Sequence, residues 1–407
     1  MSLRAFLYDD PADAQRFLPF TDSRPIGELR YGAWLIRERA ARLLGAVEGH
    51  VAAPHLAGFV EPEAPPVVTP DAKGTRLFLR SSFVLDANAA LAKELAGGAR
   101  PKAVRLVDAS GATVGCVLAD GAPWPGADAI PEGWPAQTVL GRRLIGAWLL
   151  VGDLLPVLRA DLEAEARSRE TTRVPASSTV IGDATQLMVD EGATVEPLVV
   201  FDLRGGPIWI QAGAEIRSFT RLAGPLLVGR GTRIVGGQLR ESSIGPRCVV
   251  HGEVSNCLFL GYANKSHDGF LGHSIVGRWV NLGAGTITSN LKNTYGPVRL
   301  DLGAERVETG MTFLGTLFGD HVKTAIGTML PTGAVLGTGA NVFGTRRPAG
   351  RVHPFAWGTD EAGRITAGRM FLQTASRVLP RRDVAFDAAT QAWLSAVYTH
   401  ATGRPCD

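Results

Sequence analysis

The sequence predicts three parts: an α/β domain over residues 1–150, a parallel β-helix over residues 176–345, and C-terminal helices within residues 346–407. Two observations lead to this order. Strand-like and helix-like stretches alternate over about 145 residues at the start, which is typical of an α/β layer domain. Over three runs, residues 210–234, 258–300 and 318–342, most positions spaced six apart hold an apolar or small residue. That period fits neither a helix nor a single strand, and it is typical of a coil of triangular cross-section.

Composition narrows the class of protein. At 407 residues the chain is too long for one compact core, so two or three units are expected. A formal net charge of +3 is too small for a nucleic-acid-binding surface, and we expect no nucleic-acid partner. No apolar run reaches the roughly 18 residues of a membrane helix, and the N-terminal residues lack a secretory pattern. The four cysteines form no CxxC pair, so we expect a cytoplasmic protein with reduced thiols and no metal site.

In the first domain, periodicity predicts both strands and helices. The expected strands are residues 2–8, Thr75–Val84, Ala103–Asp108 and Thr113–Leu118. The expected helices are Tyr31–Leu44 and Leu85–Leu95. Together they predict a largely parallel sheet with helices packed on it.

A connecting helix is expected over Val151–Arg169, within a linker of residues 151–175. After Gly344 the six-residue pattern stops, and residues 345–355 read as an exit loop. Two more helices are expected, at Glu361–Val378 and Asp387–His400, with Asp387 as the N-cap of the second. These helices would cap the open end of the coil and cover its unpaired strand edges.

The residues spaced six apart form what we call the inward column. Each of them is expected to point into the coil from one of its sides. Three polar residues, Asn264, Thr288 and Thr294, stand on this column among aliphatic ones such as Leu258 and Val276, with Phe270 between them. Shifted registers over residues 239–258 predict short insertions or loops at the corners, and residues 302–311 predict a loop or an extended hairpin. The polar members lie close in sequence to five further polar residues, namely Lys265, His267, Asn281, Asn290 and Lys292.

The segment with these polar residues carries a family resemblance. His267–Gly272 reads HDGFLG, and Asn281–Asn290 reads NLGAGTITSN. Without a gap, the two resemble the acetyltransferase half of the bifunctional N-acetylglucosamine-1-phosphate uridylyltransferase and glucosamine-1-phosphate acetyltransferase, with Phe270 at the family's tyrosine. Including Thr21–Arg30 and Gly319–Met329, the whole chain resembles a sister group of sugar nucleotidyltransferases.

The resemblance implies a left-handed β-helix, a homotrimer, and acetyl-CoA or another acyl-CoA as co-substrate. His267 would be the general base that takes a proton from a sugar amine, because imidazole is neutral near pH 7. The other substrate, a sugar phosphate or nucleotide sugar, would contact Asn264, Lys265, Phe270, Asn281, Asn290 and Lys292. The acyl-CoA would contact Ala284, Gly285, His321 and Lys323. From the spacing, His321 would lie on the same side as His267, three coils away.

The N-terminal domain resembles a nucleotidyltransferase in its Leu18–Thr21 motif, and Thr21, Arg24 and Arg30 would bind a nucleotide. Where that family has a glycine-rich phosphate loop, this chain has Tyr8–Pro11, with two acidic residues. Three functions stay open. The first is an N-acyltransferase with a degenerate nucleotidyltransferase domain. The second is an active, Mg²⁺-dependent nucleotidyltransferase whose coil only forms the trimer. The third is a non-catalytic scaffold that binds a nucleotide sugar.

Overall fold

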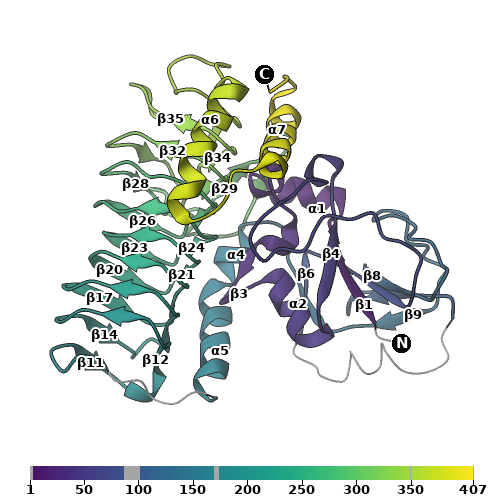
Figure 1. Ribbon diagram of the computed structural model, residues 1–407, viewed down its shortest axis with the longest axis horizontal. Helices are drawn as coiled ribbons and strands as arrows, with labels where there is room; N and C mark the ends of the chain where they lie inside the picture. The colour runs from purple at the N-terminus through teal and green to yellow at the C-terminus, as the bar shows by residue number, and fades with distance from the viewer. Residues whose placement is uncertain (1–2, 87–100, 169–173, 349, 407) are drawn as a thin grey trace.

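The computed structural model describes residues 3–86, 101–168, 174–348 and 350–406. It has the three parts in the expected order, and the second is a parallel β-solenoid (Figure 1). The solenoid stands on the left in Figure 1, the N-terminal domain lies on the right, and the C-terminal helices run between them at the top. In the described residues, no helix has the length and apolar character needed to cross a bilayer.

The N-terminal domain is built on a six-stranded sheet in the order β4-β1-β5-β8-β7-β9. Its strands are β1 (Arg4–Tyr8), β4 (Val47–Val51), β5 (Arg76–Arg80), β7 (Ala103–Val107), β8 (Thr113–Leu118) and β9 (Ala136–Thr138). The sheet is mixed rather than largely parallel, because β8 runs antiparallel to both β5 and β7. The reason is local: the short turn from Asp108 to Ala112 joins β7 to β8, and so short a connection permits only antiparallel pairing.

Short elements surround this sheet. They are α1 (Pro11–Arg16), η1 (Phe20–Asp22), η2 (Ile26–Glu28), β2 (Arg30–Tyr31), β3 (Trp34–Leu35), α2 (Ile36–Leu44), η3 (Pro54–Leu56), β6 (Phe83–Leu85) and β10 (Gly141–Arg143). The helix expected from Tyr31 begins only at Ile36, because β2 and β3 form a hairpin before it. Leu85 ends β6, and residues 87–95 of the other expected helix lie outside the described residues.

The solenoid has three faces, named here in chain order. The first face carries β11 (Thr179–Ile181), β14 (Val200–Asp202), β17 (Thr220–Ala223), β20 (Gly237–Arg240), β23 (Glu253–Ser255), β26 (Phe270–Gly272), β28 (Ile287–Thr288) and β33 (Met329–Leu330). The second face carries β12 (Leu187–Val189), β15 (Ile208–Ile210), β18 (Leu226–Val228), β21 (Ser243–Ile244), β24 (Leu258–Phe259), β27 (Ile275–Val276), β31 (Leu317–Phe318), β34 (Val335–Leu336) and β36 (Arg351–Val352). The third face carries β13 (Thr194–Val195), β16 (Glu215–Ile216), β19 (Arg233–Ile234), β22 (Val249–Val250), β25 (Asn264–Lys265), β32 (Lys323–Thr324) and β35 (Asn341–Val342).

The inward column matches the expectation over most coils, but it slips by one residue around the motif. Phe259 pairs with the inward Val276, and Lys265 pairs with the inward Val250. Leu271, not Phe270, is the inward residue of β26. The predicted inward set Leu258, Asn264 and Phe270 therefore faces outward, because the preceding coils are shorter than three full six-residue sides.

Residues 291–313 leave the coil, so Thr294 and Leu300 are not part of the column. Within them β29 (Arg299–Asp301) and β30 (Arg306–Glu308) pair antiparallel, which is the hairpin expected near residues 302–311. Because of this insertion, Val276 stacks directly on Phe318 in the next coil.

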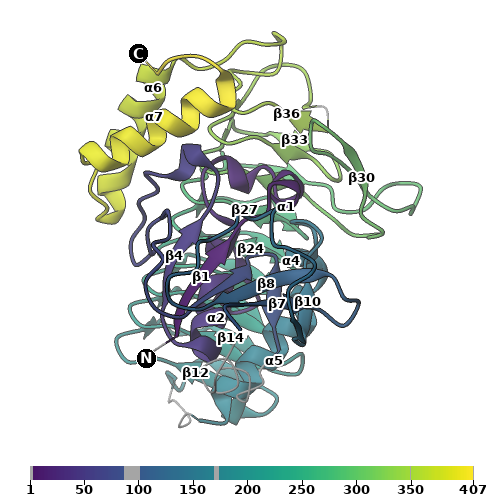
Figure 2. The same ribbon diagram turned by 90° about the vertical axis from the view of Figure 1, so that its right-hand side faces the viewer.

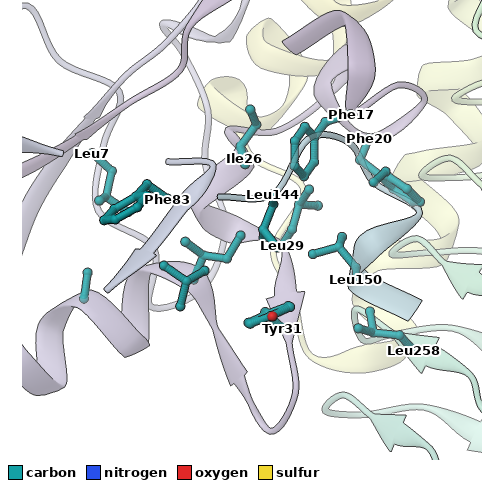
Figure 3. Close-up of a cluster of buried hydrophobic side chains, with 14 of the residues drawn as sticks. Leu7, Phe17, Phe20, Ile26, Leu29, Tyr31, Phe83, Leu144, Leu150 and Leu258 are labelled. Carbon is teal, nitrogen blue, oxygen red and sulfur yellow. The ribbon is translucent and has the colours of Figure 1, made fainter. Parts of the chain in front are cut away.

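The second face packs against the N-terminal domain. Its outward residues Leu258, Ile275 and Leu317 are fully buried in one core with residues of that domain. Figure 3 shows Leu258 beside Leu150 of α4 (Leu149–Gly152), with Phe17 and Phe20 nearby. Helix α5 (Leu154–Ala166) continues down the same side (Figure 1). The N-terminal domain and the solenoid thus share one apolar core.

The solenoid continues beyond residue 345, because β36 pairs with β34 and Trp357 bridges to Asn341. The C-terminal helices are α6 (Gly368–Val378) and α7 (Ala388–Thr402), linked through η5 (Leu379–Arg382). Asp387 is the N-cap of α7, as expected, and accepts the amide of Thr390 at 2.8 Å.

These two helices do not cover the open end of the coil. They pack in a second core with Tyr262, Trp279 and Phe355, which lie where the second face turns into the third, and with Phe59 of the N-terminal domain. Figure 2 shows them as a pair beside the coils. They therefore seal the junction of the other two parts, because the coil corner offers them aromatic side chains.

Candidate functional site

His267 lies at the corner between the third and first faces, just after β25. Its side chain is exposed, and it has no hydrogen-bond partner among the described residues. The adjacent Asp268 turns away, with its carboxylate 3.2 Å from Nδ1 of His251. His267 is therefore accessible to a ligand.

Lys265 lies inside the coil beneath His267. It is 2% exposed, and its Nζ donates to the carbonyl oxygen of His267 at 2.6 Å. Burial lowers the pKa of Lys265 to about 8. The structure thus places this lysine as a support for the backbone of His267, not on the side of the coil that a substrate could reach.

Ala284 and Gly285 stack on the same corner, one coil further on. The Gly285 amide donates to the Asp268 carbonyl at 3.1 Å, and the Gly327 amide donates to the Ala284 carbonyl at 2.7 Å. The corner then leads into a cavity of about 170 Å³. Its walls are residues 325–329 on one side and residues 342–348 on the other, with Arg346 and Arg347 among them. These two arginines were read from the sequence as part of an exit loop, and only the stacking of coils brings them to this corner.

On the first face, Phe270 and Asn290 are neighbours. A Cβ added to Gly272 would meet the Phe270 ring at 2.5 Å and the Asn290 amide nitrogen at 2.7 Å. That amide also lies 2.8 Å from Nδ1 of His273. Lys292 follows in the insertion, where its Nζ donates to the carbonyl of Pro297. The face beside His267 therefore presents one ring and one carboxamide.

On the third face, Asn264 and Asn281 form a separate group with Lys323. Asn264 donates to Asn281 at 2.8 Å, and Asn281 bridges to Lys323 in the next coil. They line a cavity of about 250 Å³ together with Arg381 and Arg382. Burial lowers the pKa of Lys323 to about 8. The substrate-binding residues predicted from the sequence thus lie on two faces, the first and the third, which meet at His267. Arg381 and Arg382, which also line this cavity, were not predicted from the sequence.

His321 is not on the side of the coil that carries His267. It lies at the corner between the second and third faces, with its ring stacked on Trp279 and edge-on to Phe371. It is 3% exposed, and burial lowers its pKa to about 3. The spacing argument, which takes three six-residue sides per coil, fails here because of the insertion at residues 291–313. The structure therefore leaves His321 no surface for acyl-CoA.

Arg24 sits in a buried ion-pair network between the N-terminal domain and the solenoid. Its guanidinium is 2.6 Å from Asp320 and 2.7 Å from Glu61, and its side chain has no exposed surface. Arg278 completes the network at 2.7 Å from Glu61. Thr21 is buried as well and donates to the carbonyl of Ala14 at 2.6 Å. These placements leave the side chains of Arg24 and Thr21 in the interior of the protein, whereas Arg30 borders a cavity at the junction of the three parts.

Carboxylates occupy the end of β1, where a nucleotidyltransferase has its phosphate loop. The Asp10 carboxylate accepts the amides of Ala12 and Asp13 at the start of α1, at 2.9 and 3.3 Å. Arg80 pairs with Asp10 at 3.0 Å and with Asp13 at 2.5 Å. The amides that would hold a phosphate are already bonded, and these carboxylates are engaged by protein groups. Across the described residues, no three His, Cys, Asp or Glu side chains gather as the ligands of an all-protein metal site would.

Comparison with known proteins agrees with this organisation. A family model described as "Sugar nucleotidyl transferase" matches residues 5–117. The chain is similar to the bifunctional sugar-1-phosphate nucleotidylyltransferase/acetyltransferase of Sulfurisphaera tokodaii, with 29% identity over 91 residues, 22% of this chain and 23% of that protein. It is also similar to the bifunctional protein GlmU of Methanococcus aeolicus, with 24% identity over 214 residues, 52% of this chain and 47% of that protein. To the GlmU of a Jannaschia species it is 29% identical over 157 residues, 36% of this chain and 32% of the relative.

The matches thus cover less than half the length of each of these relatives. The name of the Sulfurisphaera relative describes a bifunctional transferase, a sugar-1-phosphate nucleotidylyltransferase and acetyltransferase. A family model described as sugar nucleotidyl transferase thus matches the first domain, a β-solenoid follows it, and the chain is similar in part to bifunctional sugar-1-phosphate nucleotidylyltransferase/acetyltransferases.

Proposed function

We propose that this protein is an acyl-CoA-dependent N-acyltransferase that acts on an amino-sugar phosphate or a nucleotide sugar. One observation supports this most strongly. His267, the backbone at Ala284 and Gly285, and the cavity beside Arg346 and Arg347 follow one another along a single corner of the coil. An acyl-CoA needs a base near its thioester, a narrow apolar path for its arm, and cations near its phosphates. The corner offers these features in that order.

In the proposed reaction the amine nitrogen of the sugar attacks the carbonyl carbon of the thioester. The His267 imidazole takes the proton that this nitrogen loses as the new C–N bond forms. The C–S bond then breaks, and the CoA sulfur leaves with the proton that the imidazolium returns. Lys265 holds the carbonyl of His267 at 2.6 Å and so fixes the loop that carries the base. Phe270 and Asn290 contact the sugar from the first face, and Asn264 and Asn281 contact it from the third.

The same corner carries exposed apolar side chains, which favours a site shared between copies of this chain. Phe219 is 79% exposed and Ile326 is 83% exposed, and both stand on the corner between the third and first faces. Leu198 and Phe343, on the same corner, are 52% and 39% exposed. Large apolar side chains in one line on a surface are typical of an interaction face. A homotrimer that packs along this edge would enclose His267 between two copies.

The N-terminal domain then serves as a docking module rather than a nucleotidyl transferase. Carboxylates occupy the position of its phosphate loop, and the Arg24 guanidinium pairs with Asp320 of the solenoid. The second candidate, nucleotidyl transfer, would need the end of β1 to accept a triphosphate, and the Asp10 and Asp13 carboxylates would repel one. The observed geometry therefore favours acyl transfer.

The test is release of free thiol from acetyl-CoA in the presence of amino-sugar phosphates and amino-sugar nucleotides. We expect release with one of these acceptors, lost by about a hundredfold or more in His267→Ala. His353→Ala is the matched control, since His353 is also exposed but lies away from this corner. Pyrophosphate release from a nucleoside triphosphate and a sugar 1-phosphate, without thiol release, would replace this proposal by the second candidate. Equal activity in His267→Ala and the unaltered chain would reject His267 as the base.

A further inference from the structure

A cavity of about 330 Å³ lies where the three parts of the protein meet. The hairpin of β2 and β3 and the start of α2 form one wall, the corner between the second and third faces forms another, and residues 382–384 close it. Six arginines line it, against three carboxylates from Glu38, Glu63 and Asp383. The arginines are Arg30, Arg37, Arg230, Arg247, Arg278 and Arg382. The lining therefore has an excess of positive charge.

Four of these arginines are paired with carboxylates, at distances from 2.6 Å for Arg37 with Glu28 to 3.6 Å for Arg230 with Glu63. Arg30 and Arg382 have no carboxylate within 4.0 Å among the residues that the structure describes. Arg30 is only 8% exposed. Its guanidinium makes one hydrogen bond among the described residues, from Nη1 to the carbonyl oxygen of Ala33. The Glu38 carboxylate, which also lines the cavity, offsets part of the cost of burying this guanidinium without an ion-pair partner.

Two buried N–H groups in this lining are also unused. The Nε atoms of Arg30 and Arg278 have no hydrogen-bond partner among the described residues, and Arg278 is 5% exposed. Burial lowers the pKa of Arg30, the Glu38 carboxylate partly offsets this, and the nearby Arg278 adds to the lowering. An unsatisfied buried donor usually costs about 1–3 kcal/mol, so its presence indicates an acceptor that binds from outside the chain.

The arginines that line the cavity indicate which kind of hydrogen-bond acceptor would bind there. Guanidinium groups bind phosphate oxygens through two parallel hydrogen bonds, and several converging arginines suit a group with more than one phosphate. The cavity adjoins the one on the third face, with which it shares Tyr262 and Arg382. Arg381 and Arg382 line that second cavity, so the positive charge continues into it.

We propose that this junction cavity binds the pyrophosphate group of a phosphorylated ligand such as a nucleotide sugar, held by Arg30, Arg278 and Arg382. The site is separate from the end of β1, where the family fold would place a nucleotide, and from the acyl-CoA corner at His267. Because Arg30 belongs to the N-terminal domain, Arg278 to the solenoid and Arg382 to the C-terminal segment, the ligand would bridge all three parts. Binding would therefore stabilise their arrangement as a unit.

The experiment titrates the full chain with inorganic pyrophosphate, with UDP-glucose and with uridine, by calorimetry and by thermal unfolding. We expect binding of pyrophosphate and of UDP-glucose, each with a rise in Tm, and no binding of uridine. Tighter binding of UDP-glucose than of pyrophosphate would support the proposal with a nucleotide sugar as occupant. Equal affinities would support it with the pyrophosphate group alone as the recognised element. No binding of either phosphate compound would overturn it.

Two variants locate the site. Arg30→Gln and Arg382→Gln should each weaken binding of pyrophosphate by about tenfold to a hundredfold, as expected for loss of a charged hydrogen-bond donor. Arg382 is only half-buried, so its variant is expected to fold. The control is Arg377→Gln, an exposed arginine of α6 outside this lining, which should bind as the unaltered chain does. His267→Ala should also bind normally, which keeps this test independent of the acyltransferase proposal. Undiminished binding in both Arg30→Gln and Arg382→Gln would overturn the assignment.

Discussion

The guanidinium of Arg24 lies 2.6 Å from the carboxylate of Asp320, although 296 residues separate the two in the chain. Asp320 also accepts the hydroxyl of Ser23 at 2.6 Å and the backbone amide of Arg278 at 2.7 Å. Burial opposes the charge on Asp320, but Arg24 overrides it and holds the pKa of this carboxyl below its ordinary value. Two arginines and two carboxylates balance here, so the network joins the N-terminal domain to the solenoid without leaving a net buried charge.

The first prediction concerns this pair. Asp320→Leu leaves Arg24 and Arg278 opposite Glu61 alone, and should lower the free energy of unfolding by about 3–5 kcal/mol. The double variant Arg24→Met with Asp320→Leu keeps Arg278 opposite Glu61, so it should be less destabilised than the two single changes added together. Urea unfolding of all four proteins measures this. Strictly additive effects would show that the two side chains are not coupled.

The second prediction concerns Lys265, whose pKa is lowered to about 8. Below pH 8 the buried ammonium is charged in the folded state, and folding carries a cost of at most about 3 kcal/mol. As the pH rises from 8 toward 10.5, the unfolded chain holds more protons than the folded one, so stability rises. Lys265→Met should remove that contribution.

Urea unfolding at several pH values between 7 and 10.5 compares Lys265→Met with the unaltered chain. The variant should be the more stable of the two at pH 7, and the difference should shrink as the pH rises. Thiol release should fall in the variant, because the carbonyl of His267 loses its donor. A difference in stability that does not depend on pH would contradict the lowered pKa of Lys265.

A third prediction tests the arginines beside the acyl-CoA corner. Arg346→Gln combined with Arg347→Gln should raise KM for acetyl-CoA about tenfold with little change in kcat, because the phosphates lie far from the reacting bond. The loss should be smaller with dephospho-CoA, which lacks one phosphate. Arg404→Gln, exposed at the C-terminal end, serves as the control. A fall in kcat at unchanged KM would place these arginines near the reacting atoms instead.

The fourth prediction tests association along the exposed edge. Ile326→Asp puts a charge on a side chain that is 83% exposed, so the single chain should fold normally while the assembly dissociates. Light scattering after gel filtration should show the mass of a trimer for the unaltered chain and of a monomer for the variant. Leu140→Asp makes the same change on the N-terminal domain, at a side chain 57% exposed, and should keep the trimer. A monomeric unaltered chain would refute the shared site.

The sequence by itself determined the class of fold, because a six-residue period records the inward side chain of every coil side. The sequence did not predict the mixed sheet, the register slip that turns Lys265 inward, or the burial of His321. They depend on turn length, on short coils and on an insertion at residues 291–313, which shift the register without changing the local pattern.

The pairing of Arg24 with Asp320 and the gathering of arginines at the junction were decided only by the tertiary structure. Within its own segment, nothing in the local sequence distinguishes any of these arginines from an exposed one. Its burial and its partner depend on a segment distant in the chain, and local periodicity carries no information on such contacts.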